Sequence, residues 1–284
     1  MSGRLAYRDF EAQEAFVVEC RRRIDAWRVP SELRLVQTGL GPTTVLVAGG
    51  PSASNGRSRP VLVLPGTNLA AAALLPLAAH LARTRQVLVV DLPGQPGLSY
   101  PKRPSHFGAY GGWLDEVVTS LDRRPTVVAH ALGAAVALLA TPEHVVDLLL
   151  VNPAGIVKPR RTAALTIAEL RWRVRPSATT ARAFLQRLGA PAARPRDETV
   201  QWLALVGTHA HPALTPSPVG DDVLARWSGR ADDVRILAGA VDPRFPPDRL
   251  ATIAGTHGLA TTVVQGAGHL IPDERPEAIA AALR

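Results

Sequence analysis

The sequence of 284 residues contains a single cysteine, Cys20. One thiol cannot form an internal disulfide, so nothing requires an oxidising compartment, and we expect a cytoplasmic protein. The N-terminal segment is charged throughout and lacks the apolar core of a secretory signal. The longest apolar stretch, residues 69–82, is interrupted by Pro76 and His80 and is shorter than the ~20 residues needed to cross a bilayer. We therefore expect neither export nor a membrane span.

Sequence signals for a cofactor, a metal or a nucleic acid are also missing. There is no intact dinucleotide fingerprint and no phosphate-binding loop. His209 and His211 have no obvious third metal ligand nearby. The net charge of +8 could attract polyanions, but the basic residues are spread along the chain without a nucleic-acid-binding motif. The sequence predicts no cofactor, no metal and no nucleic-acid partner.

The composition that remains is typical of a soluble globular protein, with 46% hydrophobic and 20% charged residues. The length is large for one average domain but ordinary for a single α/β domain that carries an insertion. We therefore expect one domain that buries a full core.

Short apolar runs alternate with helical segments along most of the chain. An amphipathic helix is expected at about residues 7–27, and the runs 33–40 and 43–50 predict a hairpin, followed by the turn-rich PSASNGRSRP. Further strands are expected at 61–64, 86–91, 126–129, 146–152, 233–239 and 260–266, and helices at 68–83, 110–121, from 132, at 247–255 and from 276. This alternation indicates a mostly parallel, twisted sheet with helices on both faces.

The alternation stops at residues 154–228, where the sequence becomes helical and rich in arginine, alanine and proline. We expect an inserted helical cap there, with a core formed by residues 1–153 and 229–284. Apolar residues of the cap could cover a pocket or could form the interior of the cap itself; they are Trp172, Phe184, Leu185, Leu188, Trp202, Leu203 and Leu205.

The first part of this cap is basic, with Glu169 its single acid. Its cations could attract an anionic substrate, such as a carboxylate, a coenzyme A thioester or a carrier-linked acyl group. The simpler interpretation is the solvated face of an arginine-rich helix. The residues are Lys158, Arg160, Arg161, Arg171, Arg173, Arg175, Arg182, Arg187, Arg194 and Arg196.

The segment Thr126–Ala135 combines a strand, a sharp turn and a helix. The small residues Ala129 and Gly133 flank His130 and Ala131 at the turn. This pattern is typical of a nucleophile elbow, where the turn residue is strained and the helix passes close to the strand. Taken alone, it fits an ordinary strand-to-helix turn closed by a glycine equally well.

Two further residues follow strands in the order expected of such a site. Asp242 lies just beyond the strand at 233–239, and His269 lies on a loop of small residues after the strand at 260–266. Open α/β sheets place their sites at the carboxyl ends of strands. The order elbow, acid, histidine is more specific than any of the three alone.

Together these segments resemble the α/β-hydrolase superfamily, in its capped carboxylesterase and acyl-hydrolase branch, over nearly the whole chain. The motifs are LPGTN at 64–68, DLPGQPGLS at 91–99, AHALGAA at 129–135, AVDPRFP at 240–246 and GAGHLIPDERPE at 266–277. The resemblance implies an α/β-hydrolase fold and a catalytic triad acting on an ester, thioester or lactone of a small hydrophobic molecule.

The resemblance also implies a role for each site residue. Asp242 would orient the imidazole, and His269 would act as general base and then as general acid. The backbone N–H groups of Thr67 and Leu132 would form the oxyanion hole, in which one donor can be worth ~10²–10³ in rate.

The chain departs from the family pattern at two places. Pro65-Gly66 stands where His-Gly is usual, which matters little for a backbone donor. At the nucleophile position stands Ala131, whose methyl group cannot attack a carbonyl. Three explanations are open: an engineered serine-to-alanine variant that traps substrate, a natural serine-less enzyme in which His269 and Asp242 act as a base (a lyase, cyclase or isomerase), or a non-catalytic binding protein.

Overall fold

The computed structural model describes residues 4–49, 59–213, 215–230 and 233–283. Most of the expected turn-rich segment PSASNGRSRP, residues 51–58, lies outside the described residues.

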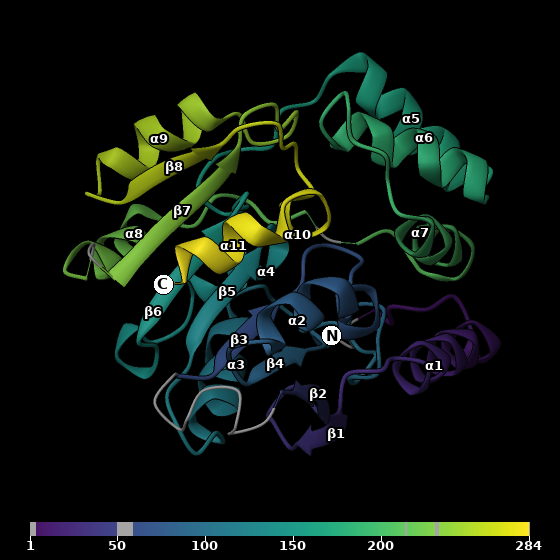
Figure 1. Cartoon of the computed structure of the whole chain (residues 1–284), viewed down its shortest axis with the longest axis horizontal. Helices are drawn as coiled ribbons and strands as arrows, with labels where there is room; N and C mark the ends of the chain where they lie inside the picture. The colour runs from purple at the N-terminus through teal and green to yellow at the C-terminus, as the bar shows by residue number, and fades with distance from the viewer. Residues whose placement is uncertain (1–3, 50–58, 214, 231–232, 284) are drawn as a thin grey trace.

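An eight-stranded sheet, ordered β1-β2-β4-β3-β5-β6-β7-β8, forms the centre of the molecule (Figure 1). The strands β1 and β2 form the expected antiparallel hairpin, β2 pairs antiparallel with β4, and all other neighbours are parallel. This confirms the mostly parallel sheet predicted from the alternation of strands and helices. The strands are β1 (Ser31–Val36), β2 (Thr43–Ala48), β3 (Val61–Leu64), β4 (Val87–Val90), β5 (Thr126–His130), β6 (Asp147–Val151), β7 (Val234–Gly239) and β8 (Ala260–Val264).

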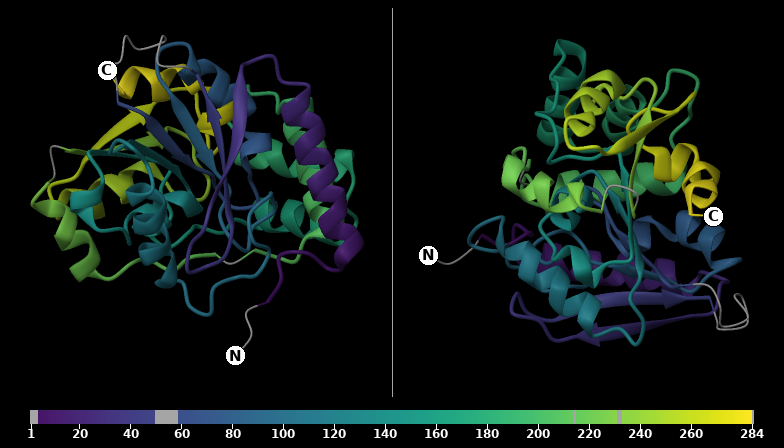
Figure 2. Two further views of the ribbon diagram at one scale, coloured as in Figure 1. Left: turned by 90° about the horizontal axis from the view of Figure 1, so that it is seen from below. Right: turned by 90° about the vertical axis from the view of Figure 1, so that its left-hand side faces the viewer.

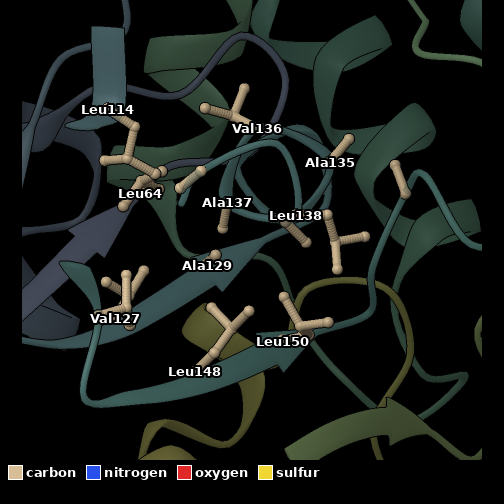
Figure 3. Packing of buried hydrophobic residues seen from close by; sticks show 14 of the residues in the cluster. Leu64, Leu114, Val127, Ala129, Ala135, Val136, Ala137, Leu138, Leu148 and Leu150 are labelled. Carbon is tan, nitrogen blue, oxygen red and sulfur yellow. The ribbon is translucent and has the colours of Figure 1, made fainter. Parts of the chain in front are cut away.

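Helices cover both faces of the sheet. One face packs against α3 (Ala109–Thr119), α4 (Leu132–Ala137), α8 (Asp221–Ser228) and α9 (Pro247–Gly255). The other packs against α2 (Leu75–Ala82), α10 (Ile271–Glu274) and α11 (Pro276–Ala282). Figure 3 shows part of the first cluster, in which the side chains of α4 meet those of β5 and β6. Short 3₁₀ turns, η2 (Ala71–Ala73) and η3 (Pro142–His144), complete the connections.

The helix expected at residues 68–83 is shorter than predicted. The chain first makes the turn η2, and α2 begins only at Leu75, with Pro76 in its first turn. Proline lacks a backbone N–H and is tolerated in the first turn of a helix but not in its interior. Pro76 therefore sets where this helix begins.

A second layer of helices lies beside the sheet. It consists of α5 (Ala163–Val174), α6 (Ala178–Leu188), α7 (Asp197–His209) and the N-terminal α1 (Phe10–Asp25). These four helices share one apolar cluster, and Figures 1 and 2 show α1 alongside α7. Asp9 caps α1 by accepting a hydrogen bond from the Ala12 backbone N–H at 2.7 Å. Within the expected insertion, α8 differs from α5–α7 because its buried Leu224 and Trp227 pack with the sheet cluster.

None of the helices in the described part of the chain combines the length and apolarity that a bilayer crossing requires.

Candidate active site

The turn between β5 and α4 holds Ala131 in a strained conformation. Its φ of 45° and ψ of −107° lie in a region that residues with a side chain rarely adopt. Its backbone N–H donates to the Val151 carbonyl at 3.0 Å, and its carbonyl accepts from the Ala134 N–H at 3.0 Å. Gly133 permits the turn, because a Cβ there would lie 2.5 Å from the Leu64 carbonyl oxygen. The backbone therefore fixes the turn on both sides.

His269 and Asp242 form a buried hydrogen-bonded pair. Nδ1 of His269 lies 2.9 Å from Oδ2 of Asp242, and the Asp242 side chain is fully buried. The other carboxylate oxygen accepts backbone N–H bonds from Arg244 at 2.8 Å and Phe245 at 3.1 Å. An ionised carboxylate can only accept hydrogen bonds, so Nδ1 of His269 carries the proton that it donates to Asp242. Nε2 of His269 is therefore the basic nitrogen of the ring.

His130 is buried directly before the strained turn. Its Nε2 lies 2.9 Å from the His269 carbonyl and therefore donates to it. Burial, reinforced by the nearby imidazole of His269, lowers the pKa of His130 to about 3, so its ring is neutral at pH 7. Its Nδ1 has no hydrogen-bond partner among the residues that the structure describes, and it lies against Gly66, where a Cβ would approach it to 2.4 Å.

The loop after β3 brings Thr67 beside this turn. A Cβ built on Gly66 would lie 3.4 Å from the Ala131 Cβ, so the two loops are in contact. Asn68, with a φ of 63°, reverses the chain, and its carbonyl accepts the Trp202 Nε1–H at 2.7 Å. Leu132 begins α4, where helix N–H groups have no intrahelical acceptor.

The buried carboxylate of Asp91 holds the far end of the loop that follows β3. Asp91 accepts backbone N–H bonds from Ala71 at 2.7 Å and from Leu98 at 2.7 Å. Burial raises the pKa of Asp91 to about 6, against the opposing effect of these two bonds.

Asn152, which sequence reasoning did not single out, connects the two loops that carry the acid and the histidine. It is fully buried, has a φ of 43° and directly follows β6. Its side-chain amide donates to the Gly268 carbonyl at 2.9 Å and accepts the Gly239 N–H at 2.7 Å. Its position, a polar residue at the carboxyl end of an apolar parallel strand, was the available signal.

Helix α6 ends against the histidine loop. The His269 N–H donates to the Leu188 carbonyl at 2.8 Å. Glu274 accepts from the backbone N–H groups of Gly268 at 2.8 Å and Ala190 at 3.2 Å. The histidine loop is therefore bound to α6 as well as to the sheet.

One pocket collects several of the residues singled out in the sequence. Thr67, His130, Ala131 and His269 line one pocket that opens to solvent. Asp242 lies behind His269, and Leu132 and Gly133 lie in α4 below the turn. The remaining wall is mainly apolar and comes in part from α5, α6 and α7, which contribute Trp172, Phe184, Leu185, Leu188 and Leu203.

In the described residues, no group of three or more His, Cys, Asp and Glu side chains has a geometry that could hold a metal ion. His211 instead lies 3.0 Å from an Arg4 guanidinium nitrogen.

Residues 61–282 match a family model described as the alpha/beta hydrolase family. This stretch includes every residue of the pocket and all strands from β3 onward, and it leaves out α1 and the hairpin. No curated protein shows significant sequence similarity to the chain.

Solved structures from Bacillus subtilis share the fold. A putative hydrolase superposes with a TM-score of 0.79 at 16% identity, covering 96% of this chain and 98% of the other. Naproxen esterase (carboxylesterase NP) gives 0.78 at 18% identity, with coverages of 97% and 98%. The carboxylesterase CesB gives 0.76 at 18% identity, with coverages of 96% and 97%. At these identities the likeness establishes the fold alone.

Proposed function

We propose that this chain, which belongs to the alpha/beta hydrolase family, carries the site of a serine-type carboxylic ester hydrolase in which Ala131 occupies the nucleophile position. The substrate is an ester, thioester or lactone of a small, moderately hydrophobic molecule. Helices α5, α6 and α7 act as the cap over its pocket.

The observation that carries this proposal is the conformation of Ala131. A residue with a Cβ is held at positive φ at the carboxyl end of a central strand, in the same pocket as a histidine that is hydrogen-bonded to a buried aspartate. A nucleophile elbow needs this turn, and the order elbow, acid, histidine is that of the fold. The carboxylesterase structures described above share the fold and are consistent with the assignment.

Each group then has a chemical task. Nε2 of His269 is the base that would take a proton from a nucleophile and return it to the leaving group, while Asp242 orients the ring and stabilises its cation. The N–H groups of Thr67 and Leu132 would bind the developing oxyanion. The methyl group of Ala131 cannot form the acyl-enzyme, and loss of a triad serine removes ~10⁶ of rate. We expect the chain as it stands to bind substrate and to be nearly inactive as an esterase.

The test is labelling with a fluorophosphonate, read by intact mass, on this chain and on Ala131→Ser side by side. Only the serine variant is expected to gain the adduct, and His269→Ala added to it should prevent labelling. If neither protein is labelled while both remain folded, the site does not support a nucleophile at position 131 and the proposal is wrong.

A second candidate function follows from the intact pair of His269 and Asp242 beside an inert methyl group. In that case His269 removes a proton from the substrate itself or from water, as in a lyase, a cyclase or an isomerase, and no acyl-enzyme forms. The unaltered chain would then have a reaction of its own that His269→Ala abolishes. A purely binding protein would keep its ligand affinity in the same variant.

A further inference from the structure

One wall of the pocket is built from two arginines, two aromatic rings and one carboxylate. Trp172 and Phe184 stack with ring centroids 5.2 Å apart. The Arg173 guanidinium carbon lies 5.1 Å from the Trp172 ring, and that of Arg244 lies 6.0 Å from the Phe184 ring. Glu169 joins the two cations, with its oxygens 3.0 Å from Arg173 and 2.7 Å from Arg244. All five residues line the pocket.

The charges of this wall do not balance, because one carboxylate serves two guanidinium groups that stay protonated in proteins. The carboxylates of Asp273, in the pocket lining, and of Asp242, which is bonded to His269, are already engaged. Asp273 pairs with Arg196 at 2.9 Å. Both oxygens of Asp242 are occupied by His269 and by backbone N–H groups. The wall therefore keeps one excess positive charge.

The two guanidinium groups also keep free donors. Within the described residues, Arg244 donates from its side chain only through Nη2, to Glu169, and Arg173 only through Nε and Nη2, to the same residue. The Arg244 side chain is 19% exposed and that of Arg173 is 30% exposed, so their remaining N–H groups are partly shielded from water. Hydrogen bonds from arginine to a carboxylate are among the strongest in proteins, and the planar fork matches a carboxylate in shape.

The rest of the pocket suits the apolar body of the same ligand. Phe245, next to Arg244, lies with its ring 5.6 Å from the His269 ring, so the cationic wall adjoins the proposed catalytic histidine. Apolar side chains complete the lining; among them are Leu74, Leu77, Leu185, Leu188 and Leu203.

We propose that the ligand of this pocket carries a carboxylate on an apolar body, and that Arg244 and Arg173 bind this carboxylate while the ester faces His269. The substrate class is thus an acidic ester, such as the half-ester of a medium-chain dicarboxylic acid. This rests on the proposed function, since it names the substrate class of the same site.

The first experiment compares two probes of equal chain length, monomethyl suberate and dimethyl suberate, by calorimetric titration of the unaltered chain. The half-ester carries a carboxylate and the diester does not. We expect the half-ester to bind about tenfold more tightly, as a charge-assisted hydrogen bond predicts. Catalysis should show the same preference as binding: in Ala131→Ser, kcat/KM for the half-ester should exceed kcat/KM for the diester.

Removing a cation and removing the carboxylate of the wall should change this preference in opposite directions. Arg244→Gln should abolish it, and Arg244→Lys should restore part of it by keeping the charge without the fork. Glu169→Gln should strengthen half-ester binding about threefold or more, since the internal competitor for both cations is lost. Arg182→Gln is the matched control, because it removes a guanidinium from α6 that pairs with Asp197 at 2.6 Å outside the pocket lining, and it should leave the preference unchanged.

The outcomes separate this inference from the proposed function. Equal binding of the two probes by folded protein, or a preference that survives both Arg244→Gln and Arg173→Gln, overturns the carboxylate site even if Ala131→Ser cleaves dimethyl suberate. If Ala131→Ser neither labels nor cleaves either ester while the half-ester still binds more tightly, the carboxylate site stands and the hydrolase proposal fails.

Discussion

The carboxyl ends of the strands, which together form one edge of the sheet, and the layer of helices beside the sheet hold their pocket residues in different ways. At the sheet edge, Ala131, Asp242 and His269 lie on short loops whose backbone groups are hydrogen-bonded to neighbouring loops and strands. In the layer of helices, the pocket wall is held by stacked rings and by ion pairs between side chains, such as Glu169 with Arg244. Backbone bonds fix a reacting atom more tightly than pairs of long side chains do. Substitutions at the sheet edge should therefore change the chemistry, and substitutions in the helices should change stability and ligand choice.

The largest expected effect is at the sheet edge. In the Ala131→Ser background, His269→Ala should lower esterase kcat/KM by ~10⁴-fold or more, because the serine then has no base. The melting temperature should change little, and binding of a substrate analogue should persist. Hydrolysis retained within tenfold would show that another group acts as the base.

The next effect concerns the contact between the two regions. Trp202 is fully buried in α7, packs edge-on against Phe16 of α1 at 5.4 Å and donates to the Asn68 carbonyl. Trp202→Ala should lower the free energy of unfolding by about 3–5 kcal/mol, as measured by urea denaturation. Trp202→Phe keeps most of the packing and loses only the N–H, so it should cost much less. Equal losses would mean that the hydrogen bond, not the packing, dominates.

A smaller effect is expected for substitution of Asn152. This substitution tests whether the residue positions the loops of Asp242 and His269 without taking part in the reaction. Asn152→Gly tolerates the positive φ but removes both side-chain hydrogen bonds, at a cost of about 1–3 kcal/mol in stability. In the Ala131→Ser background it should lower kcat more than it raises KM, since the Gly239 and Gly268 loops carry the acid and the histidine.

Thr141→Ala is the matched control for Asn152, because it removes a side-chain hydrogen bond to Asp115 away from the pocket. It should cost stability and leave kcat unchanged. A drop in kcat of similar size in both variants would contradict a positioning role for Asn152.

The smallest net effect is the dependence of stability on pH, because two buried groups, His130 and Asp91, act in opposite directions. The pKa of His130 is lowered in the folded protein to about 3 from 6.5, so between these values the unfolded chain binds more protons. This residue therefore contributes stability that is present above pH 6.5 and is lost as the pH falls towards 3, by about 1.4 kcal/mol per pH unit. Asp91, with its pKa raised to about 6, acts in the opposite direction between its ordinary value and pH 6.

The pH prediction is measured from urea midpoints between pH 4 and pH 7. His130→Gln keeps an N–H that can reach the His269 carbonyl, and the glutamine side chain does not take up a proton in this pH range. In this variant the opposing contribution of Asp91 should remain, so stability should rise as the pH falls from 6 to 4. Parallel curves for the variant and the unaltered chain would contradict the burial effect on His130.

Much of the sheet could be predicted from the sequence because each parallel strand is a short apolar run bounded by turn residues. Helix α9 begins and ends at the expected residues because Pro247 opens it and Gly255 closes it. The helix predicted at 68–83 was too long because the pattern of apolar residues outweighed the position of Pro76.

Contacts between distant segments could not be predicted. The amphipathic pattern of α1 indicated a buried face, but not that Phe16 would meet Trp202. The basic residues of the expected cap were interpreted mainly as a solvated face. The structure instead engages Arg173 with Glu169, and it brings in Arg244, a residue from the other side of the insertion. No periodicity or spacing in the sequence encodes such a pairing.

The strained turn at Ala131 has a consequence for attaching probes to this protein. Hydrogen bonds to Val151 and Ala134 and the close approach of Gly133 to Leu64 set the direction of the Cα–Cβ bond at this position. That direction does not depend on which side chain is present. Because Cys20 is buried in α1, a cysteine introduced by Ala131→Cys would be the accessible thiol among the described residues. A ligand in the pocket would cover this thiol, so the rate at which a small alkylating reagent modifies it should fall when a ligand is bound.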